Sequence, residues 1–306
     1  MKKLLILPLL SSMAFAELTG SFGIIGGQME VIDNFDDHSI NHTIYSRDTK
    51  PKTFDRYLLL PSMDLDYNGF FAKVETKDGG GFKAGYSWGE DSAIYAMKDG
   101  FGIEHNFYEN FFYKIEKFNE DKFINPYLIN QERGKKESDS LFIETGVKEY
   151  LELVDLKLAY YDMSIDDEVN SDVKQSGKQY DLESLVYVLP FVGLGLNYGM
   201  GNFDGDSNDY TKLGYKLALR WMFGDSARVM LEMSKNEYDF DVANSYFNKI
   251  RDEEENSIFF MYMQEGLLGD SNMFLTTMYF QSETTSNIDF FYKQNKGLMV
   301  NIGYKF

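Results

Sequence analysis

Apolar and polar residues alternate along most of this chain, and the alternation is clearest at its C-terminus. In the last ten residues, one side of an extended chain would carry Leu298, Val300, Ile302, Tyr304 and Phe306. The other side would carry mostly small or polar residues. Because a β-strand turns successive side chains to opposite faces, this period of two predicts a strand with one apolar face.

The same pattern recurs from residue 18 to the end, and helical periodicity is weak throughout. We expect strands at 18–32, 63–67, 69–77, 110–118, 139–148, 152–161, 177–188, 191–202, 211–222, 226–234, 254–265, 271–283 and 297–306. The stretch 78–109 is harder to divide, and its short candidate strands are 81–88, 91–98 and 101–107. We therefore predict an all-β antiparallel barrel of about 14 strands, within a range of roughly 12–16.

The connections between these segments alternate in length. The short turns are Asn68-Gly69, Glu149–Glu152, Leu189-Pro190, Gly224–Ser226 and Leu267–Ser271. The long polar loops are 33–53, 119–138, 164–176, 203–210, 241–253 and 284–296. Short turns at one end and long loops at the other are typical of an outer-membrane barrel whose short turns and termini are periplasmic.

The first sixteen residues are predicted to be an export signal. A positive start, Lys2-Lys3, precedes the apolar run Leu4–Leu10, and Ala16 ends a small-x-small cleavage pattern. Cleavage before Glu17 would leave 17–306 as a single barrel domain. Loss of the two lysines would take the formal net charge from −19 to −21.

Composition narrows the possible functions. Beyond the export signal, no apolar run approaches the roughly eighteen residues of a membrane-spanning helix, although 43% of the 306 residues are hydrophobic. The absence of cysteine excludes disulfide scaffolds and thiolate sites. With 49 acidic against 30 basic residues, nucleic acid is not an expected partner.

A soluble β-sandwich also alternates, so further features must favour a membrane barrel. Aromatic residues make up 16% of the chain and gather on strands and near their ends, as an interfacial girdle requires. Examples are Tyr57, Tyr67, Phe70, Trp88, Phe111, Tyr187, Tyr198, Trp221, Phe223, Phe274 and Tyr279. Charged residues alternate with apolar ones on the same strands, which fits a wet interior surrounded by lipid.

Two resemblances agree with this prediction. The ending Tyr304-Lys305-Phe306 resembles the signature by which Gram-negative outer-membrane barrels are recognised by the barrel assembly machinery. Over 54–306, the runs Asn125–Leu128, Ser164–Glu168 and Phe203–Asp206 are similar to an uncharacterised outer-membrane family, classed as a domain of unknown function. These resemblances imply a barrel among outer-membrane lipid and lipopolysaccharide, with no implied activity. A homo-oligomer is a further possible partner arrangement, and the sequence does not distinguish it from a monomer.

If leucine, valine and aromatic side chains face lipid, the alternate positions face the interior. The candidate lumen-lining residues are then Asp64, Asp66, Glu116, Glu144, Asp155, Lys157, Asp181, Glu183, Lys212, Lys216, Arg220, Arg228 and Glu232. Bases gather on 211–222 and 226–234 and acids on earlier strands. We therefore expect opposed acidic and basic walls, whose transverse field would orient polar solutes.

The expected function is passive diffusion of small polar solutes. A barrel of about 14 strands is too wide for side chains to fill, which favours a pore over a plug of ion pairs. Acidic runs such as Asp166–Glu168 and Asp252–Glu255 would favour cations at the mouth, although solvated surface acids are the simpler interpretation. Two alternatives are a non-conducting structural or surface-interaction barrel with acidic loops, and a rim hydrolase.

Motifs for chemistry are incomplete. Residues 204–209 begin like a calcium loop, but Asp209 stands where glycine is needed and Tyr215 where a bidentate glutamate is needed. The histidines, His38, His42 and His105, are too few for a zinc site of several histidines. No cofactor, metal or catalytic residue is predicted, and the chain is not expected to be an enzyme.

Overall fold

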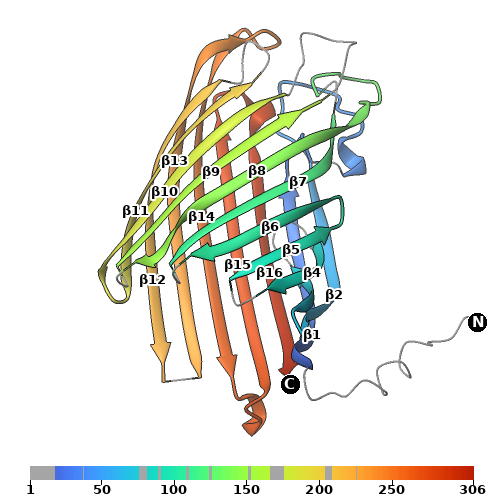
Figure 1. Ribbon diagram of the computed structural model, residues 1–306. Coiled ribbons are helices and arrows are strands. Elements are labelled where there is room, and N and C mark those ends of the chain that lie inside the picture. The colour runs from blue at the N-terminus through green and yellow to red at the C-terminus, as the bar shows by residue number, and fades with distance from the viewer. Residues whose placement is uncertain are drawn as a thin grey trace, which may run out of the picture.

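In the computed structural model, sixteen antiparallel strands close into one barrel among the described residues (Figure 1). The structure describes residues 18–306 without 37, 76–80, 89–90, 108–109, 124–125, 151–152, 166–175, 204–208 and 225. The strands are β1 (Leu18–Ile32), β2 (Thr53–Tyr67), β3 (Phe70–Glu75), β4 (Gly81–Trp88), β5 (Ser92–Met97), β6 (Gly100–Phe107), β7 (Phe111–Phe123), β8 (Lys135–Tyr150), β9 (Val154–Ser164), β10 (Gly177–Leu189), β11 (Val192–Phe203), β12 (Tyr210–Phe223), β13 (Ala227–Asn244), β14 (Lys249–Glu265), β15 (Met273–Ser286) and β16 (Lys293–Lys305). Each strand pairs with its neighbours in sequence, and β1 closes the ring on β16.

The predicted fold class is confirmed, and the number of strands lies at the upper end of the expected range. The three short candidates in 78–109 are all strands, so the favoured number of 14 was two too low. The long loop expected at 241–253 is instead formed by the ends of β13 and β14, joined at 245–248.

Short 3-10 turns lie at Ser39–Asn41, Leu267–Gly269 and Asp289–Phe291. Of the helices described, none is long and apolar enough to cross a membrane. Several predictions concern residues outside the described part of the chain: the export signal with cleavage between Ala16 and Glu17, the run Asp166–Glu168, and most of the calcium-like loop.

The two faces of each strand differ in what they expose. The outer face carries apolar side chains that are among the most exposed in the molecule, such as Leu59 at 77% and Tyr57 at 76%. The inner face carries buried residues such as Ala218, Tyr187 and Glu116. Outward side chains spread apart on the convex side of a closed sheet, whereas inward ones crowd together. The alternation in the sequence therefore corresponds to the outside and inside of a barrel.

The wall of the barrel is low on one side. β3 to β6 have 6–8 residues each, whereas the strands elsewhere have 11–18. Only residues 64–67 of β2 pair with β3, so within the described residues 53–63 have a strand partner on the β1 side alone. Pro61 lies in this segment, in keeping with the confinement of proline to strand edges, where its missing N–H breaks no ladder.

Loops from different sides of the ring meet at the end opposite the termini (Figure 1). The β1–β2 and β7–β8 loops join at a parallel bridge between Ile44 and Ile129. Phe290 of the β15–β16 loop packs in the same apolar cluster as Tyr127 of the β7–β8 loop. These two hairpins lie eight strands apart in either direction round the ring, so their contact crosses the mouth. We call this cluster the loop cap; it comprises Phe35, Ile44, Tyr127, Ile129, Phe247, Ile288, Phe290 and Phe291.

A buried arginine ties the loops of the cap together. Arg133 is 2% exposed and donates hydrogen bonds to the backbone oxygens of Asn34 at 2.8 Å, Asn41 at 2.7 Å and Pro126 at 3.0 Å. Its guanidinium carbon lies 3.9 Å from the centre of the Phe123 ring. Burial lowers the pKa of Arg133 to about 10, so the group stays charged at neutral pH. A buried cation with this many acceptors fixes the loops in one arrangement.

Candidate functional site

The charged residues selected from the sequence lie on the inner face of the barrel. The strand pleat and register put them there together: Asp64, Asp66, Glu116, Glu144, Asp155, Lys157, Asp181, Glu183, Lys212, Lys216, Arg220, Arg228 and Glu232. This position makes them candidates for contact with any solute inside the barrel. We call the inner face of β7–β12 the charged wall.

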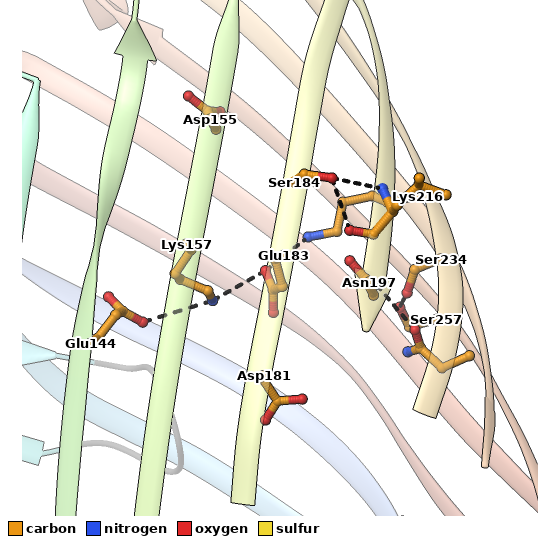
Figure 2. A network of polar contacts seen from close by, with 12 residues as sticks. Glu144, Asp155, Lys157, Asp181, Glu183, Ser184, Asn197, Lys216, Ser234 and Ser257 are labelled. Atoms are coloured by element: carbon orange, nitrogen blue, oxygen red, sulfur yellow. Dashed lines mark hydrogen bonds and ion pairs between the residues drawn. The ribbon is translucent and has the colours of Figure 1, made fainter. Parts of the chain in front are cut away.

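A chain of ion pairs crosses the charged wall from β8 to β12 (Figure 2). Nζ of Lys157 lies 3.8 Å from a carboxylate oxygen of Glu144 and 3.1 Å from one of Glu183. Glu183 in turn lies 3.5 Å from Nζ of Lys216. These side chains are 19–35% exposed, so solvent screens them and each pair contributes about 1 kcal/mol or less.

The charges can pair across β11 because that strand presents almost no side chains to the interior. Glycine occupies every inner position of its central part except Asn197. A Cβ on Gly199 would lie 2.6 Å from Oδ1 of Asp181 and 2.8 Å from Cε of Lys212. These two side chains form an ion pair beside the glycine. Glycine on β11 therefore lets the acids of β10 reach the lysines of β12.

A second polar cluster is centred on Glu116 of β7. Its carboxylate accepts a hydrogen bond of 2.7 Å from the Tyr95 hydroxyl. It also lies 3.2 Å from Nζ of both Lys83 and Lys114. The cluster joins β4, β5 and β7. Ionic contacts therefore extend from the charged wall to the short strands β3–β6, which we call the low sector.

The predicted opposition of acidic and basic walls is wrong. The bases of β12 pair with acids on β9 and β10, on the same side of the barrel. The pairs are Lys212–Asp181, Lys216–Glu183 and Arg220–Asp155. Opposite charges this close cancel most of each other's field at a distance, so no strong transverse field is expected.

The inner face of β14, β15, β16, β1 and β2 is apolar in its middle, which the sequence reasoning missed. We call these residues the apolar wall: Ile25, Met29, Leu58, Leu60, Phe259, Met261, Met263, Phe274, Met278, Phe280 and Met299. Residues 258–263 and 273–280 are mostly apolar on both faces, so alternation there is weak. Phe274, and Tyr187 on β10, were expected in an outer girdle and lie on the inner face instead.

A polar hollow of about 640 Å³ adjoins the loop cap, with Ile129, Phe247 and Ile288 in its lining. Its lining includes Tyr45, Arg47, Asp48, Tyr246 and Lys249. The guanidinium carbon of Arg47 lies 5.2 Å from the centre of the Tyr246 ring. The hollow is therefore lined by charges of both signs and by aromatic rings.

The histidines do not form a complete catalytic group in the described part of the chain. His38 and His42 lie in the β1–β2 loop and pack against phenylalanine rings. His105 lies on the outer face of β6, with Nδ1 2.6 Å from Oγ of Ser92. A serine–histidine pair needs a third group to orient the imidazole. Among the described residues, no carboxylate hydrogen-bonds the other ring nitrogen, and no group of three or more acidic or histidine residues could hold a metal.

A protein-family model matches residues 18–305, nearly the whole chain. The family is described as a protein of unknown function, DUF2860, and this chain belongs to it. The expected resemblance to an uncharacterised family is thereby confirmed, and the match also runs through residues 78–109. Among the curated proteins, none matches this chain.

Several solved structures share the fold at low sequence identity. Acinetobacter baumannii OccAB1 is similar with a TM-score of 0.55 and 8% identity, covering 95% of this chain and 97% of that one. Pseudomonas aeruginosa OccK8 (OprE) has a TM-score of 0.54 and 7% identity, covering 95% and 98%. The outer membrane protein OprD from Pseudomonas aeruginosa has a TM-score of 0.51 and 8% identity, covering 95% and 94%. At these identities the likeness is one of fold.

Proposed function

We propose that this protein lies in the bacterial outer membrane and lets small polar solutes diffuse passively through its interior. The observation that carries the proposal is a closed sixteen-stranded barrel whose inner ion pairs stay partly exposed. Barrels of about sixteen strands are wide enough for an aqueous channel, whereas those of about eight are filled by side chains. The shared fold with the outer membrane protein OprD supports this location.

The outer face supports insertion into lipid. Leu59, Leu196 and Leu213 are 65–77% exposed, and a continuous surface of such residues would aggregate in water. A closed barrel also satisfies most of its backbone groups without water, the exception in the described strands being the β3 side of residues 53–63. At a 45° tilt, the short strands of the low sector span only about 14–19 Å of an apolar band about 25 Å tall. We expect the bilayer to thin beside this sector.

Export and assembly belong to the same proposal. Cleavage between Ala16 and Glu17 would release the mature chain into the periplasm. Tyr304 and Phe306 are 44% and 49% exposed, at the end of β16, where the barrel assembly machinery could contact them. Lipid and lipopolysaccharide would surround the outer face.

A modest preference for cations follows from the excess of acidic residues. The formal net charge is −19 for the whole chain. Pairing on the charged wall cancels much of the local field, so the preference should be weaker than the net charge suggests. The loop cap narrows the mouth and restricts passage to small solutes.

Conductance across a planar bilayer tests the proposal on the purified full chain. We expect stepwise conductance with a modest preference for cations. Changing Lys216 and Arg220 together to glutamate should raise that preference on the order of threefold, because Glu183 and Asp155 each lose one basic partner and the inner face gains two acids.

The matched control changes Lys117 and Lys235, which lie on the outer face, to glutamate. This variant alters net charge equally and should leave selectivity unchanged. A correctly inserted protein that never conducts would instead support the alternative of a structural or surface-interaction barrel closed by the loop cap.

A further inference from the structure

The apolar wall forms a continuous belt across five neighbouring strands. Its members lie opposite one another from strand to strand, except that Gly27 of β1 stands between Met299 and Leu58. The opposed pairs are Phe259–Phe280, Met261–Met278, Met278–Met299, Met299–Gly27 and Gly27–Leu58. The belt therefore follows the strand pairing from β14 to β2.

No ionisable side chain interrupts this belt on the described strands. The inner face of β15 carries none over its whole length, and that of β16 carries none between Lys293 and Lys305. On β14 the nearest inner charges are Glu255 and Glu265, on either side of the apolar stretch. A polar channel does not need such an uncharged sector, so the belt calls for an explanation of its own.

Two phenyl rings of the belt lie over bare backbone. A Cβ on Gly297 would lie 2.6 Å from Cζ of Phe280, and a Cβ on Gly303 would lie 2.4 Å from Cζ of Phe274. The tip of each ring therefore occupies the space that a side chain on the glycine would fill, and Nζ of Lys305 lies 6.0 Å from the centre of the Phe274 ring. Aromatic rings can stack on a planar apolar group or receive a cation.

The part of the belt on β14 and β15 is accessible, whereas Ile25 and Met299 are buried. Phe259, Met261, Met278 and Phe280 are all partly exposed on the inner face. A barrel of sixteen strands is too wide for side chains to meet across it and exclude water. Binding of a solute that covers this apolar surface would be favourable, because the surface would be removed from water.

The remaining inner face supplies the complementary chemistry. Between the two walls, β13 presents Glu232, Ser234 and Asn236 to the interior. Beyond it, the charged wall offers partly exposed groups of both signs, such as Lys216 and Glu183. A solute inside the barrel therefore meets apolar surface on one side and paired charges on the other.

We propose that the interior selects small amphipathic solutes, namely zwitterions or ions that carry an aromatic or branched aliphatic group. The apolar group lies against the belt and the charged group faces β12 and β13. This inference rests on the proposed diffusion function and names the class of solute that the same interior prefers.

Two zwitterionic amino acids of similar length, L-phenylalanine and L-glutamine, serve as probes. Initial uptake of each labelled probe is measured in proteoliposomes containing the full chain. Equilibrium binding of each is measured separately, with the protein in lipid nanodiscs. We expect uptake at low concentration and binding both to favour phenylalanine by about fivefold, as burial of part of one ring implies.

Variants assign this preference to the belt. Changing Phe259 and Phe280 together to serine should bring the ratio of phenylalanine to glutamine near one. Changing both to leucine should keep most of the preference, because the surface stays apolar. The control is Phe142→Ser, which removes an inner phenylalanine from the charged wall and should leave the ratio unchanged.

The outcomes separate this inference from the proposed function. Uptake of both probes at equal rates in the unmodified protein would overturn the inference and leave diffusion standing. An unchanged ratio in the double serine variant, or an equal loss in Phe142→Ser, would also overturn it. Binding that favours phenylalanine without uptake of either probe would support the belt as a binding site and overturn passive diffusion.

Discussion

The charged wall and the apolar wall belong to one sheet, yet different interactions link the inner side chains of their neighbouring strands. On the charged wall, side chains such as Glu144, Lys157 and Glu183 link neighbouring strands laterally. On the apolar wall, rings and thioethers lie side by side and over glycine, without charge in the middle. The difference teaches that a period of two reveals which residues share a face, but polarity alone does not reveal which face is inner.

The largest expected effect comes from placing a charge on the outer face of β14, behind the apolar wall. Phe259 and Phe260 are adjacent on β14 and point to opposite faces. Phe260→Arg should lower the free energy of unfolding by about 2–4 kcal/mol, because the cation would face lipid. Phe259→Arg should cost far less, because its charge would reach water inside. Urea unfolding from lipid vesicles measures both, and equal losses would contradict a wet interior.

A smaller effect is expected from placing a large side chain on the glycine-rich inner face of β11, in the charged wall. Gly199→Leu should destabilise the barrel by about 1–3 kcal/mol, because the new side chain would displace the pair of Asp181 and Lys212. The control is Gly26→Leu on the outer face of β1, where the nearest atom to a Cβ is 3.9 Å away. The same unfolding measurement should give nearly no change for the control. If Gly199→Leu left the free energy of unfolding unchanged, room for the pair of Asp181 and Lys212 would not explain why β11 is rich in glycine.

The smallest effect is expected from breaking the chain of ion pairs at its centre. Lys157→Met removes a partner from both Glu144 and Glu183. Stability should fall by about 1 kcal/mol or less, because these groups are partly exposed. A loss of about 3–5 kcal/mol would show a dry, buried network instead. In bilayer recordings the variant should prefer cations slightly more than the unmodified protein does.

Most of the fold could be predicted from the sequence, because alternation is strong where one face is apolar and the other charged. β12 shows this well, since Leu213, Tyr215 and Leu217 alternate with lysines and glycine. The short strands β4 to β6 were recognised as candidates, but their length left the strand number uncertain. The charged candidates were placed on one face by the same alternation.

The apolar wall could not be predicted, because hydrophobic residues occupy both faces of β14. In the run Ser257–Met263, outer Ile258, Phe260 and Tyr262 alternate with inner apolar side chains. Only the register with β13 and β15 separates the two sets. The pairing of charges across β11 also needed the structure, because it joins strands that are not neighbours. The loop cap was missed because it joins loops from distant parts of the chain.

Cysteine accessibility tests the central claim most directly, namely that the inner face of these strands meets water while the outer face meets lipid. The chain has no native cysteine, so a single introduced thiol reports its own surroundings. Cysteines are placed one at a time at Ile258, Phe259, Phe260 and Met261, and each protein in lipid vesicles is treated with a charged maleimide. We predict labelling at 259 and 261 but not at 258 and 260. Labelling only at 258 and 260, or equal labelling at all four positions, would contradict a wet inner face and a lipid-facing outer face.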